Sequence, residues 1–283
     1  MGILSDRKID SHCHVLDPAR FPYHPDVAYR PAGQEMGNAT YFKELMDCYA
    51  VQHALLVGPN SGYATDNSCL LDAIANSNGR FRGIAVVPND CSDTQLDALQ
   101  AQGVIGIAFN PSLMGCDFYA NLEPLLMRLK NREMWAQFQV EKDLLLPFLP
   151  MLNRVNGKIL IDHCGRPDLQ QGIEQAGFQA LLALGREGRA VVKISGYAKF
   201  SQLAYPFADV QPFVDALLKN FGTHNCVWAS DWPYLKAPYR LDYGPMLKVF
   251  ESQFSESERS TMLWDAPMQH FKFPIWPSTH KQQ

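Results

Sequence analysis

The sequence predicts an α/β protein, a (β/α)8 barrel built as a single domain over residues 1–283. Three observations predict this fold: eight short apolar runs recur along the chain, segments with helical spacing lie between them, and the connections are short. A chain of 283 residues, 47% of them hydrophobic, is long enough for one such barrel. A second full domain is therefore not expected.

The eight apolar runs are the expected strands. Runs such as GIAVV, KILID and AVVKI are almost continuously apolar and rich in Val and Ile, which is typical of parallel strands covered on both faces. Each run ends in a polar or glycine-containing segment. The expected strands are 8–15, 53–59, 81–87, 104–110, 135–141, 158–165, 190–196 and 226–233.

Helical spacing between these runs predicts the covering helices. Two helix starts, at Ser92 and Ser255, have Gln or Glu three residues later, the spacing of a capping box. Pro147 and Pro150 argue against a helix after the fifth strand. The tail, residues 273–283, is rich in proline and polar residues and is expected to be irregular. Other helices are expected at 42–49, 70–75, 122–129, 178–184 and 213–221.

Composition excludes several classes of partner. A net charge of -4 and the lack of any run of Lys and Arg remove the electrostatic basis for binding nucleic acid. No stretch reaches about 18 apolar residues, and the start MGILSDRKID lacks the apolar core of a secretion signal. We therefore expect a cytoplasmic protein with no membrane partner. The 7 cysteines form no C-x-x-C pair, which indicates reduced thiols that lie mostly in the core.

The first expected strand ends in IDSHCHV. Because strand side chains alternate, His12 and His14 share one face of the strand while Cys13 points to the other. Barrel active sites assemble at the carboxyl ends of the strands, so we expect the two imidazoles to converge there on one metal ion or one oxygen. For an H-x-H pair alone, two solvated loop histidines remain an alternative.

Two more strand ends carry candidate site residues. KILIDHCGRP places His163 at the end of the sixth strand, and by alternation Asp162 is expected to face the helices as a structural hydrogen-bond acceptor. CVWASDWPY ends the eighth strand with Asp231, a carboxylate after apolar residues that requires a partner or a function. Taken singly, each residue has a structural alternative: His163 as a packed core residue, and Asp231 as the cap of the turn that follows it. Together with His12 and His14, they predict a site at the top of the barrel.

The segments IDSHCHV, IDHCGRPDL and WASDWP resemble the signature segments of the amidohydrolase-2 branch of the amidohydrolase superfamily. Within this branch, FPYHPDVAYRP, TDNSCLLDAIA, FRGIAVV, GIAFN and MLWDAPMQHF are most similar to the 2-pyrone-4,6-dicarboxylate lactonase group. The resemblance implies a hydrolase that opens a small carboxylated lactone by attack of water on the ring ester. Asp231 would act as general base, while His12, His14 and His163 would polarise the carbonyl and stabilise the oxyanion.

The resemblance also implies substrate contacts. Tyr29, in the AYRP turn, matches a substrate-contacting tyrosine of the family, and Asn110 and Arg166 are expected at the rim of the site. Lys199 lies where the family places an arginine, so it would supply a point charge in place of a bidentate fork.

The chain departs from the lactonase pattern at the fourth strand. Ala108 and Met114 stand where the lactonases carry anion-binding arginines. Because a hydrogen bond to a charged group contributes about 1.5–3 kcal/mol, the loss of two would weaken the binding of a dianion greatly. We therefore expect a less acidic substrate, such as a related sugar-acid or muconate-type lactone.

The resemblance leaves the metal requirement and two other functions open. Elsewhere in the superfamily these positions bind zinc or another divalent ion, and His12, His14, His163 and Asp231 would suffice for one tetrahedral site. Glu141 is the only obvious additional ligand. The lactonase group is thought to act without a metal, so we expect that no cofactor is required. The alternatives are a metal-dependent decarboxylase or amide hydrolase of the same superfamily, and a non-catalytic barrel used for binding.

Overall fold

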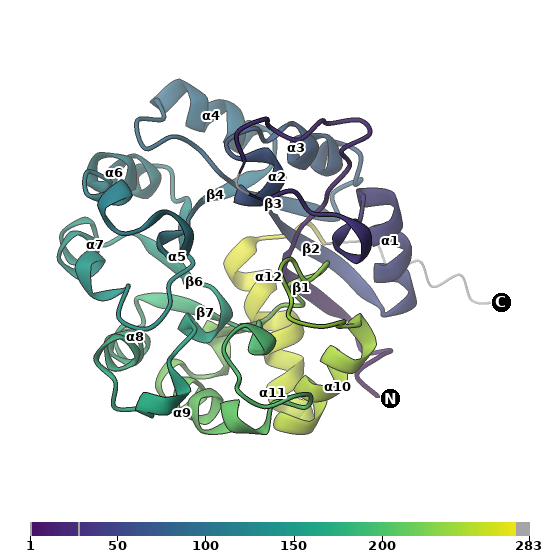
Figure 1. The fold of residues 1–283 in the computed structure, drawn as a ribbon, viewed down its shortest axis with the longest axis vertical. Helices are drawn as coiled ribbons and strands as arrows, with labels where there is room; N and C mark the ends of the chain where they lie inside the picture. Colours follow the sequence, from purple (N-terminus) through teal and green to yellow (C-terminus); the bar gives the residue numbers. More distant parts are fainter. Residues whose placement is uncertain (1, 28, 276–283) are drawn as a thin grey trace.

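Eight parallel strands follow one another in chain order around a common axis in the computed structural model (Figure 1). The structure describes residues 2–27 and 29–275. The predicted barrel is confirmed, with one strand in each of the eight expected runs. The strands are β1 (Lys8–Cys13), β2 (Val51–Val57), β3 (Phe81–Ala85), β4 (Val104–Phe109), β5 (Trp135–Phe138), β6 (Lys158–Ile161), β7 (Ala190–Ile194) and β8 (Cys226–Trp228).

The helices between successive strands surround the ring of strands (Figure 1). The capping boxes at Ser92 and Ser255 are both present. A helix also follows the fifth strand, so the expectation from Pro147 and Pro150 is wrong. Both prolines lie in the first turn of their helices, where the missing N–H has no intrahelical acceptor to lose. The helices are α1 (Ala39–Cys48), α2 (Asn60–Tyr63), α3 (Ser68–Ala75), α4 (Asp93–Ala101), α5 (Pro111–Met114), α6 (Glu123–Asn131), α7 (Leu149–Val155), α8 (Ala176–Arg186), α9 (Gln211–Phe221), α10 (Tyr243–Gln253), α11 (Glu256–Ser260) and α12 (Ala266–Phe271).

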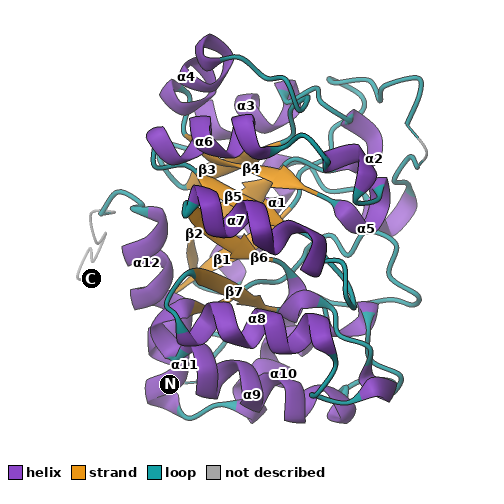
Figure 2. Ribbon diagram, turned by 90° about the vertical axis from the view of Figure 1, so that its left-hand side faces the viewer, coloured by secondary structure: helices purple, strands orange, loops and turns teal. Residues whose placement is uncertain are grey.

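Apolar side chains fill the amino-terminal end of the barrel. Inward-facing residues such as Ile9 and Leu160 form one buried cluster with Phe271 of α12 and with Phe273. Figure 2 shows α12 at this end of the barrel, while α2 and α5 lie at the opposite, carboxyl end. Because α12 closes one end, the other end is the one left for a site. Of the predicted irregular tail, 273–275 has no regular structure, and 276–283 lies outside the described residues.

The seam between β8 and β1 closes the barrel through loop residues rather than a regular ladder. The Asp231 N–H donates to the His12 carbonyl at 2.9 Å, and the His14 N–H donates to the Trp232 carbonyl at 2.8 Å. The buried Asp10 carboxylate accepts hydrogen bonds from the backbone N–H and the hydroxyl of Ser230, at 2.9 and 2.5 Å. Three of the four predicted catalytic residues therefore lie at this seam.

All 7 cysteines are free, and most are buried, as expected; Cys48 is exposed and Cys116 partly exposed. Among the described residues, no helix is both long enough and apolar enough to cross a membrane.

Candidate active site

A pocket of about 450 Å³ lies at the carboxyl end of the barrel. His12 and His14 line its floor together with polar side chains from β5 and from the end of β6. Loop residues that follow β2, β4, β6, β7 and β8 form its walls. The pocket therefore occupies the end of the barrel at which the sequence predicts the site.

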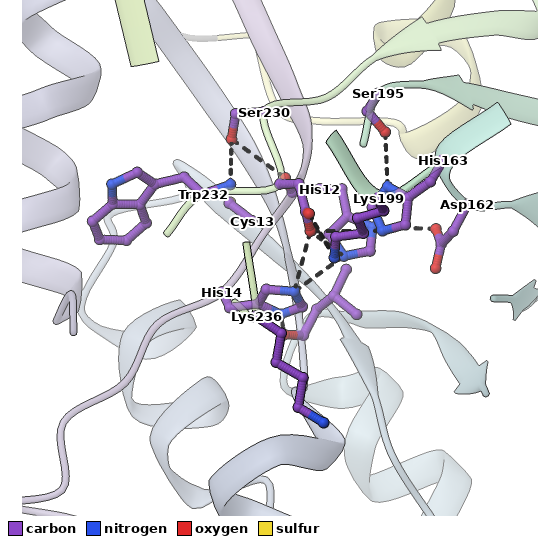
Figure 3. Close-up of polar contacts among 12 residues, drawn as sticks. His12, Cys13, His14, Asp162, His163, Ser195, Lys199, Ser230, Trp232 and Lys236 are labelled. Atoms are coloured by element: carbon purple, nitrogen blue, oxygen red, sulfur yellow. Dashed lines mark hydrogen bonds and ion pairs between the residues drawn. The ribbon is translucent and has the colours of Figure 1, made fainter. Parts of the chain in front are cut away.

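Three imidazoles and one carboxylate form a cluster at this end: His12 and His14 line the pocket, while His163 and Asp231 are buried and are not among the described residues that line it. The Nε2 atoms of His12, His14 and His163 lie 3.8, 3.7 and 3.6 Å from Asp231 Oδ1. The Nε2 atoms of His12 and His14 are 3.2 Å apart. Figure 3 shows the three rings turned toward one another. The four residues predicted from separate strand ends are thus brought together.

The other ring nitrogen of each histidine is anchored. His14 Nδ1 donates to the carbonyl of Val57 at 2.7 Å, and His163 Nδ1 lies 3.0 Å from the hydroxyl of Ser195. His12 Nδ1 lies 3.1 Å from Asp162 Oδ1. These contacts hold the rings so that every Nε2 faces Asp231.

The expectation that Asp162 faces the helices is wrong. Its carboxylate points into the barrel, where Oδ1 contacts His12 and Lys193 and Oδ2 accepts from Gln137 Nε2 at 3.0 Å. Asp162 is still extended, with φ -79° and ψ 146°, and so continues the alternation of the inward-facing Leu160. The residue that departs from alternation is His163, with a φ of 50°, so both side chains turn toward the site.

Asp162 also replaces Glu141 as the additional acidic group beside the cluster. Ligand-type atoms of His12, Asp162 and His163 lie within 4.8 Å of one another. Glu141 instead pairs with Arg166, at 2.8 Å. The suggestion of Glu141 as an extra metal ligand therefore finds no support in the geometry.

Burial and neighbouring charges set the protonation of the site. Burial raises the pKa of Asp231, but the Lys199 ammonium, 2.7 Å from Oδ2, and the three imidazoles together outweigh it, and the pKa lies well below the ordinary value. Burial, reinforced by the charge of Lys193, lowers the pKa of His12 to about 4. The pKa of His163 is also well below its ordinary value, chiefly because of burial. At neutral pH the carboxylate is ionised and these two imidazoles are neutral.

Two sets of three residues could each hold a small divalent ion: His12, His14 and Asp231, and His12, Asp162 and His163. In the first set the Nε2 atoms of His12 and His14 are 3.2 Å apart and lie 3.8 and 3.7 Å from Asp231 Oδ1, near the roughly 3.3 Å between neighbouring ligands of a tetrahedral zinc site. In addition, His163 Nε2 and Asp231 Oδ1 are buried and have no hydrogen-bond partner among the described residues. Two ligand-type atoms are thus available at the centre of the cluster.

Three of the predicted substrate contacts line the pocket: Asn110, Arg166 and Lys199. Two of them are already paired with carboxylates, Arg166 with Glu141 and Lys199 with Asp231. Their charges are thus partly neutralised before a ligand arrives.

Tyr29 lies behind the pocket wall rather than in it. It is absent from the described residues that line the pocket, and its hydroxyl donates to the Glu35 carboxylate. The ammonium of Lys236 lies over the Tyr29 ring, 4.7 Å from the ring centroid. Lys236 itself lines the pocket and, within the described part of the chain, forms no salt bridge. The sequence analysis missed this lysine.

The wall formed by β4 and α5 carries no charged side chain. Ala108, Phe109 and Leu113 line the pocket, and Met114 is exposed at the end of α5. The positions where the resemblance leads one to expect arginines therefore carry no charge in this chain.

Sequence reasoning also missed the polar side chains inside the strands. Gln137 of β5 and Lys193 of β7 are fully buried and contact Asp162. Each stands in an otherwise apolar run, WAQF and AVVKI, and that interruption was the available signal.

Comparison with known proteins agrees with this geometry. The Amidohydrolase family model matches residues 9–273. The 4-sulfomuconolactone hydrolase of Hydrogenophaga intermedia is 26% identical over 272 residues, which cover 93% of this chain and 88% of the relative. The 2-pyrone-4,6-dicarboxylate hydrolase of Comamonas testosteroni is 27% identical, with 95% and 90% covered.

A solved structure shares the fold over the whole barrel. It is that of a probable 2-pyrone-4,6-dicarboxylic acid hydrolase from Acinetobacter baumannii with citric acid bound. The TM-score is 0.81 at 26% identity, with 95% of this chain and 100% of that chain covered. From the family match and the strand-end residues of β1, β6 and β8, we conclude that the chain belongs to the amidohydrolase family.

Proposed function

We propose that this amidohydrolase opens a small lactone by attack of water on the ring ester, with Asp231 as general base. The observation that carries the proposal is the buried, ionised carboxylate whose Oδ1 lies 3.6 to 3.8 Å from three imidazole nitrogens. A water molecule beside Oδ1 can lose its proton to the carboxylate as it attacks. The lactone hydrolases among the relatives support this substrate class.

Each polar group has a distinct part in this mechanism. Lys199 keeps Asp231 ionised, so that the base is ready at neutral pH. His12 and His163 polarise the carbonyl oxygen and stabilise the oxyanion, each donor contributing about 3 kcal/mol. His14 is less suited to that role than the sequence suggested, because its Nδ1–H is used on the Val57 carbonyl and is not available to the substrate. After ring opening, Asp231 returns the proton to the departing oxygen.

We further propose that no metal ion is required. His12, His14, His163 and Asp231 would hold a divalent ion, which would supply a Lewis acid for the ester carbonyl when bound. Two buried or half-buried ammonium groups, Lys193 and Lys199, already supply positive charge at the cluster. If this is correct, purified enzyme retains its activity after exhaustive chelation.

The second candidate function is a metal-dependent decarboxylase or amide hydrolase. The close approach of three ligand-type atoms, from His12, His14 and Asp231, favours it. Metal analysis separates the two candidates. Stoichiometric metal whose removal abolishes turnover would favour the metal enzyme over the lactonase.

The substrate is proposed to carry a single carboxylate. Lys236 is the lysine of the pocket without a carboxylate partner among the described residues, whereas Arg166 and Lys199 are paired. The opposite wall, with Ala108 and Leu113, suits an uncharged part of the ring. This combination fits a monocarboxylated lactone better than a dicarboxylated one.

The experiment is a panel of uncharged, monocarboxylated and dicarboxylated lactones assayed with purified protein. We expect ring opening of a monocarboxylated member. For that substrate, Asp231→Asn should lower kcat about 10²- to 10⁴-fold, as loss of a general base does. Asp215→Asn, on the exposed face of α9, is the control and should leave kcat unchanged. No ring opening of any lactone, or an unchanged rate in Asp231→Asn, would refute the proposal.

A further inference from the structure

A lysine lies inside the barrel, in contact with the histidine cluster. Lys193 is in the middle of β7 and has no exposed surface. Its Nζ lies 2.6 Å from Gln137 Oε1, 3.0 Å from Asp162 Oδ1 and 3.0 Å from His12 Nδ1. An ammonium has three N–H donors and no lone pair, so each donor has one acceptor.

This network is complete without a proton on His12 Nδ1. Asp162 Oδ1 accepts from Lys193, and Oδ2 accepts from Gln137 Nε2 at 3.0 Å. The ion pair with Asp162 keeps the lysine charged inside the barrel, since an isolated buried charge would be costly. The acceptor that remains for the third N–H of Lys193 is His12 Nδ1.

Two proton positions are available to a neutral His12. With the proton on Nδ1, an N–H would face the Lys193 ammonium at 3.0 Å, and the Nε2 lone pair would face that of His14 at 3.2 Å. His14 cannot relieve this second clash, because its own Nδ1–H donates to the Val57 carbonyl. With the proton on Nε2, His12 accepts from Lys193 and donates to His14.

The second arrangement leaves one close contact between acceptors, His12 Nδ1 and Asp162 Oδ1 at 3.1 Å. The same ammonium contacts both atoms, so its charge offsets their repulsion. In the first arrangement Nδ1–H would donate to Asp162 Oδ1, but the same N–H would still face the ammonium, and nothing would offset the contact between the two Nε2 lone pairs.

We propose that Lys193 is a positioning residue that holds His12 in the tautomer with the proton on Nε2. Two consequences follow. The Nε2–H of His12, which donates to His14 in the free protein, is the N–H that can turn to the carbonyl oxygen of a bound lactone, and this part rests on the proposed function. A protonated Nε2 cannot ligate a metal, so Lys193 weakens the binding of a divalent ion at the cluster.

The first test needs only the native protein. Long-range ¹⁵N–¹H correlation spectra of protein labelled at histidine distinguish the two neutral tautomers, and the His12 signals are those lost in His12→Gln. We expect the pattern of an Nε2–H imidazole. An Nδ1–H pattern at His12 would overturn the proposal.

The second test removes the lysine. Lys193→Met leaves Asp162 buried without its cation and can fail to fold, so the double variant Lys193→Met with Asp162→Asn, which removes both charges, accompanies it. In the folded variant, His12 should move to the Nδ1–H tautomer. Co²⁺ affinity, measured by calorimetry and by the absorption of tetrahedral cobalt, should rise roughly 10- to 100-fold, the usual effect of a change around a metal ligand.

Lys8→Met is the matched control. Lys8 is also fully buried, but it lies at the other end of β1, where its ammonium donates to the carbonyls of Asp6 and Tyr49. Its removal should leave the His12 tautomer and the Co²⁺ affinity unchanged. Unchanged values in the Lys193 variants would overturn the proposal. Because neither readout uses a lactone, the proposed function can fail while the tautomer assignment stands, and the reverse also holds.

Discussion

At the scale of single residues, Lys199 determines when Asp231 can act as a base. Burial alone would raise the pKa of the Asp231 carboxyl, and the ammonium 2.7 Å away holds it below the ordinary value. The base form is therefore present at neutral and mildly acidic pH. It is lost only as the pH falls through this lowered pKa.

Lys199→Met should shift the acidic limb of the profile of kcat/KM against pH to higher pH. The reason is that burial then acts on Asp231 without the opposing charge, so the carboxyl becomes protonated at a higher pH. Rates measured across the acidic range test this. Lys236→Met is the control, since Lys236 makes no salt bridge with Asp231 in the described structure. An acidic limb that stays in place would contradict the assigned role of Lys199.

Lys236 should determine the affinity for a carboxylated substrate. Its ammonium lies over the ring of Tyr29, and Lys236 lines the pocket. Figure 3 shows its side chain beginning beside His14 and extending away from the imidazoles. Loss of a charged hydrogen bond of about 1.5–3 kcal/mol predicts that Lys236→Met raises KM roughly 10- to 100-fold for a monocarboxylated lactone, with little change in kcat. An uncharged lactone is the matched control and should keep its KM. An equal rise in KM for both lactones would contradict this role.

At the scale of elements, the turn after β7 positions His163. Gly196 has a φ of 69°, and a Cβ built on it would lie 2.7 Å from His163 Cβ. Ser195, the preceding residue, anchors the ring through its hydroxyl. The turn after β7 therefore determines where the imidazole from the end of β6 lies.

Gly196→Ala should lower kcat by about 10²-fold, because His163 must move away from the new methyl group. Gly188→Ala is the matched control: it also has a positive φ, 64°, but a Cβ there meets nothing within 4 Å. Both variants should lose about 1 kcal/mol of unfolding free energy from the strained backbone. Turnover assays and urea unfolding separate the two effects. Equal kcat in the two variants would show that the turn does not position His163.

At the scale of the whole molecule, the site lies where the barrel closes. His12 and His14 of the β1 segment meet Asp231 of the β8 segment across a seam with irregular backbone hydrogen bonds. The buried Asp10 and Ser230 hold the same seam together by side-chain hydrogen bonds. The contacts that close the barrel are thus also the contacts that bring His12 and His14 beside Asp231.

Ser230→Ala should therefore reduce both stability and turnover. The hydroxyl donates to Asp10 at 2.5 Å and accepts from the Trp232 N–H at 2.9 Å, so its loss should cost about 1–3 kcal/mol. Ser77→Ala is the control, since its buried hydroxyl donates to the Ile74 carbonyl at 2.7 Å in the turn before β3. It should lose comparable stability in urea unfolding and keep kcat. If Ser230→Ala keeps kcat as well, the seam does not position the site.

Local patterns in the sequence predict much of this protein. The apolar runs identify all eight strands, the two capping boxes form as expected, and His12, His14, His163 and Asp231 meet in one cluster. These features are predictable because hydrophobic period and strand order are local properties, and a barrel brings the carboxyl ends of its strands together. The errors lie where the strands end.

Only the tertiary structure decided the orientation and pairing of side chains beyond those ends. His163 joins Asp162 at the site because the backbone turns at His163, and Tyr29 lies behind Lys236 because loops distant in sequence pack together. In the sequence, Lys193 is only a charged residue within an apolar strand. In the structure, its ammonium contacts Asp162, Gln137 and His12. The sequence by itself determined the barrel and the residues at its open end. The protonation state and the partners of these residues depend on groups that are distant in the chain. The reason is that electrostatic and hydrogen-bond energies depend on distances in space, not on separation in sequence.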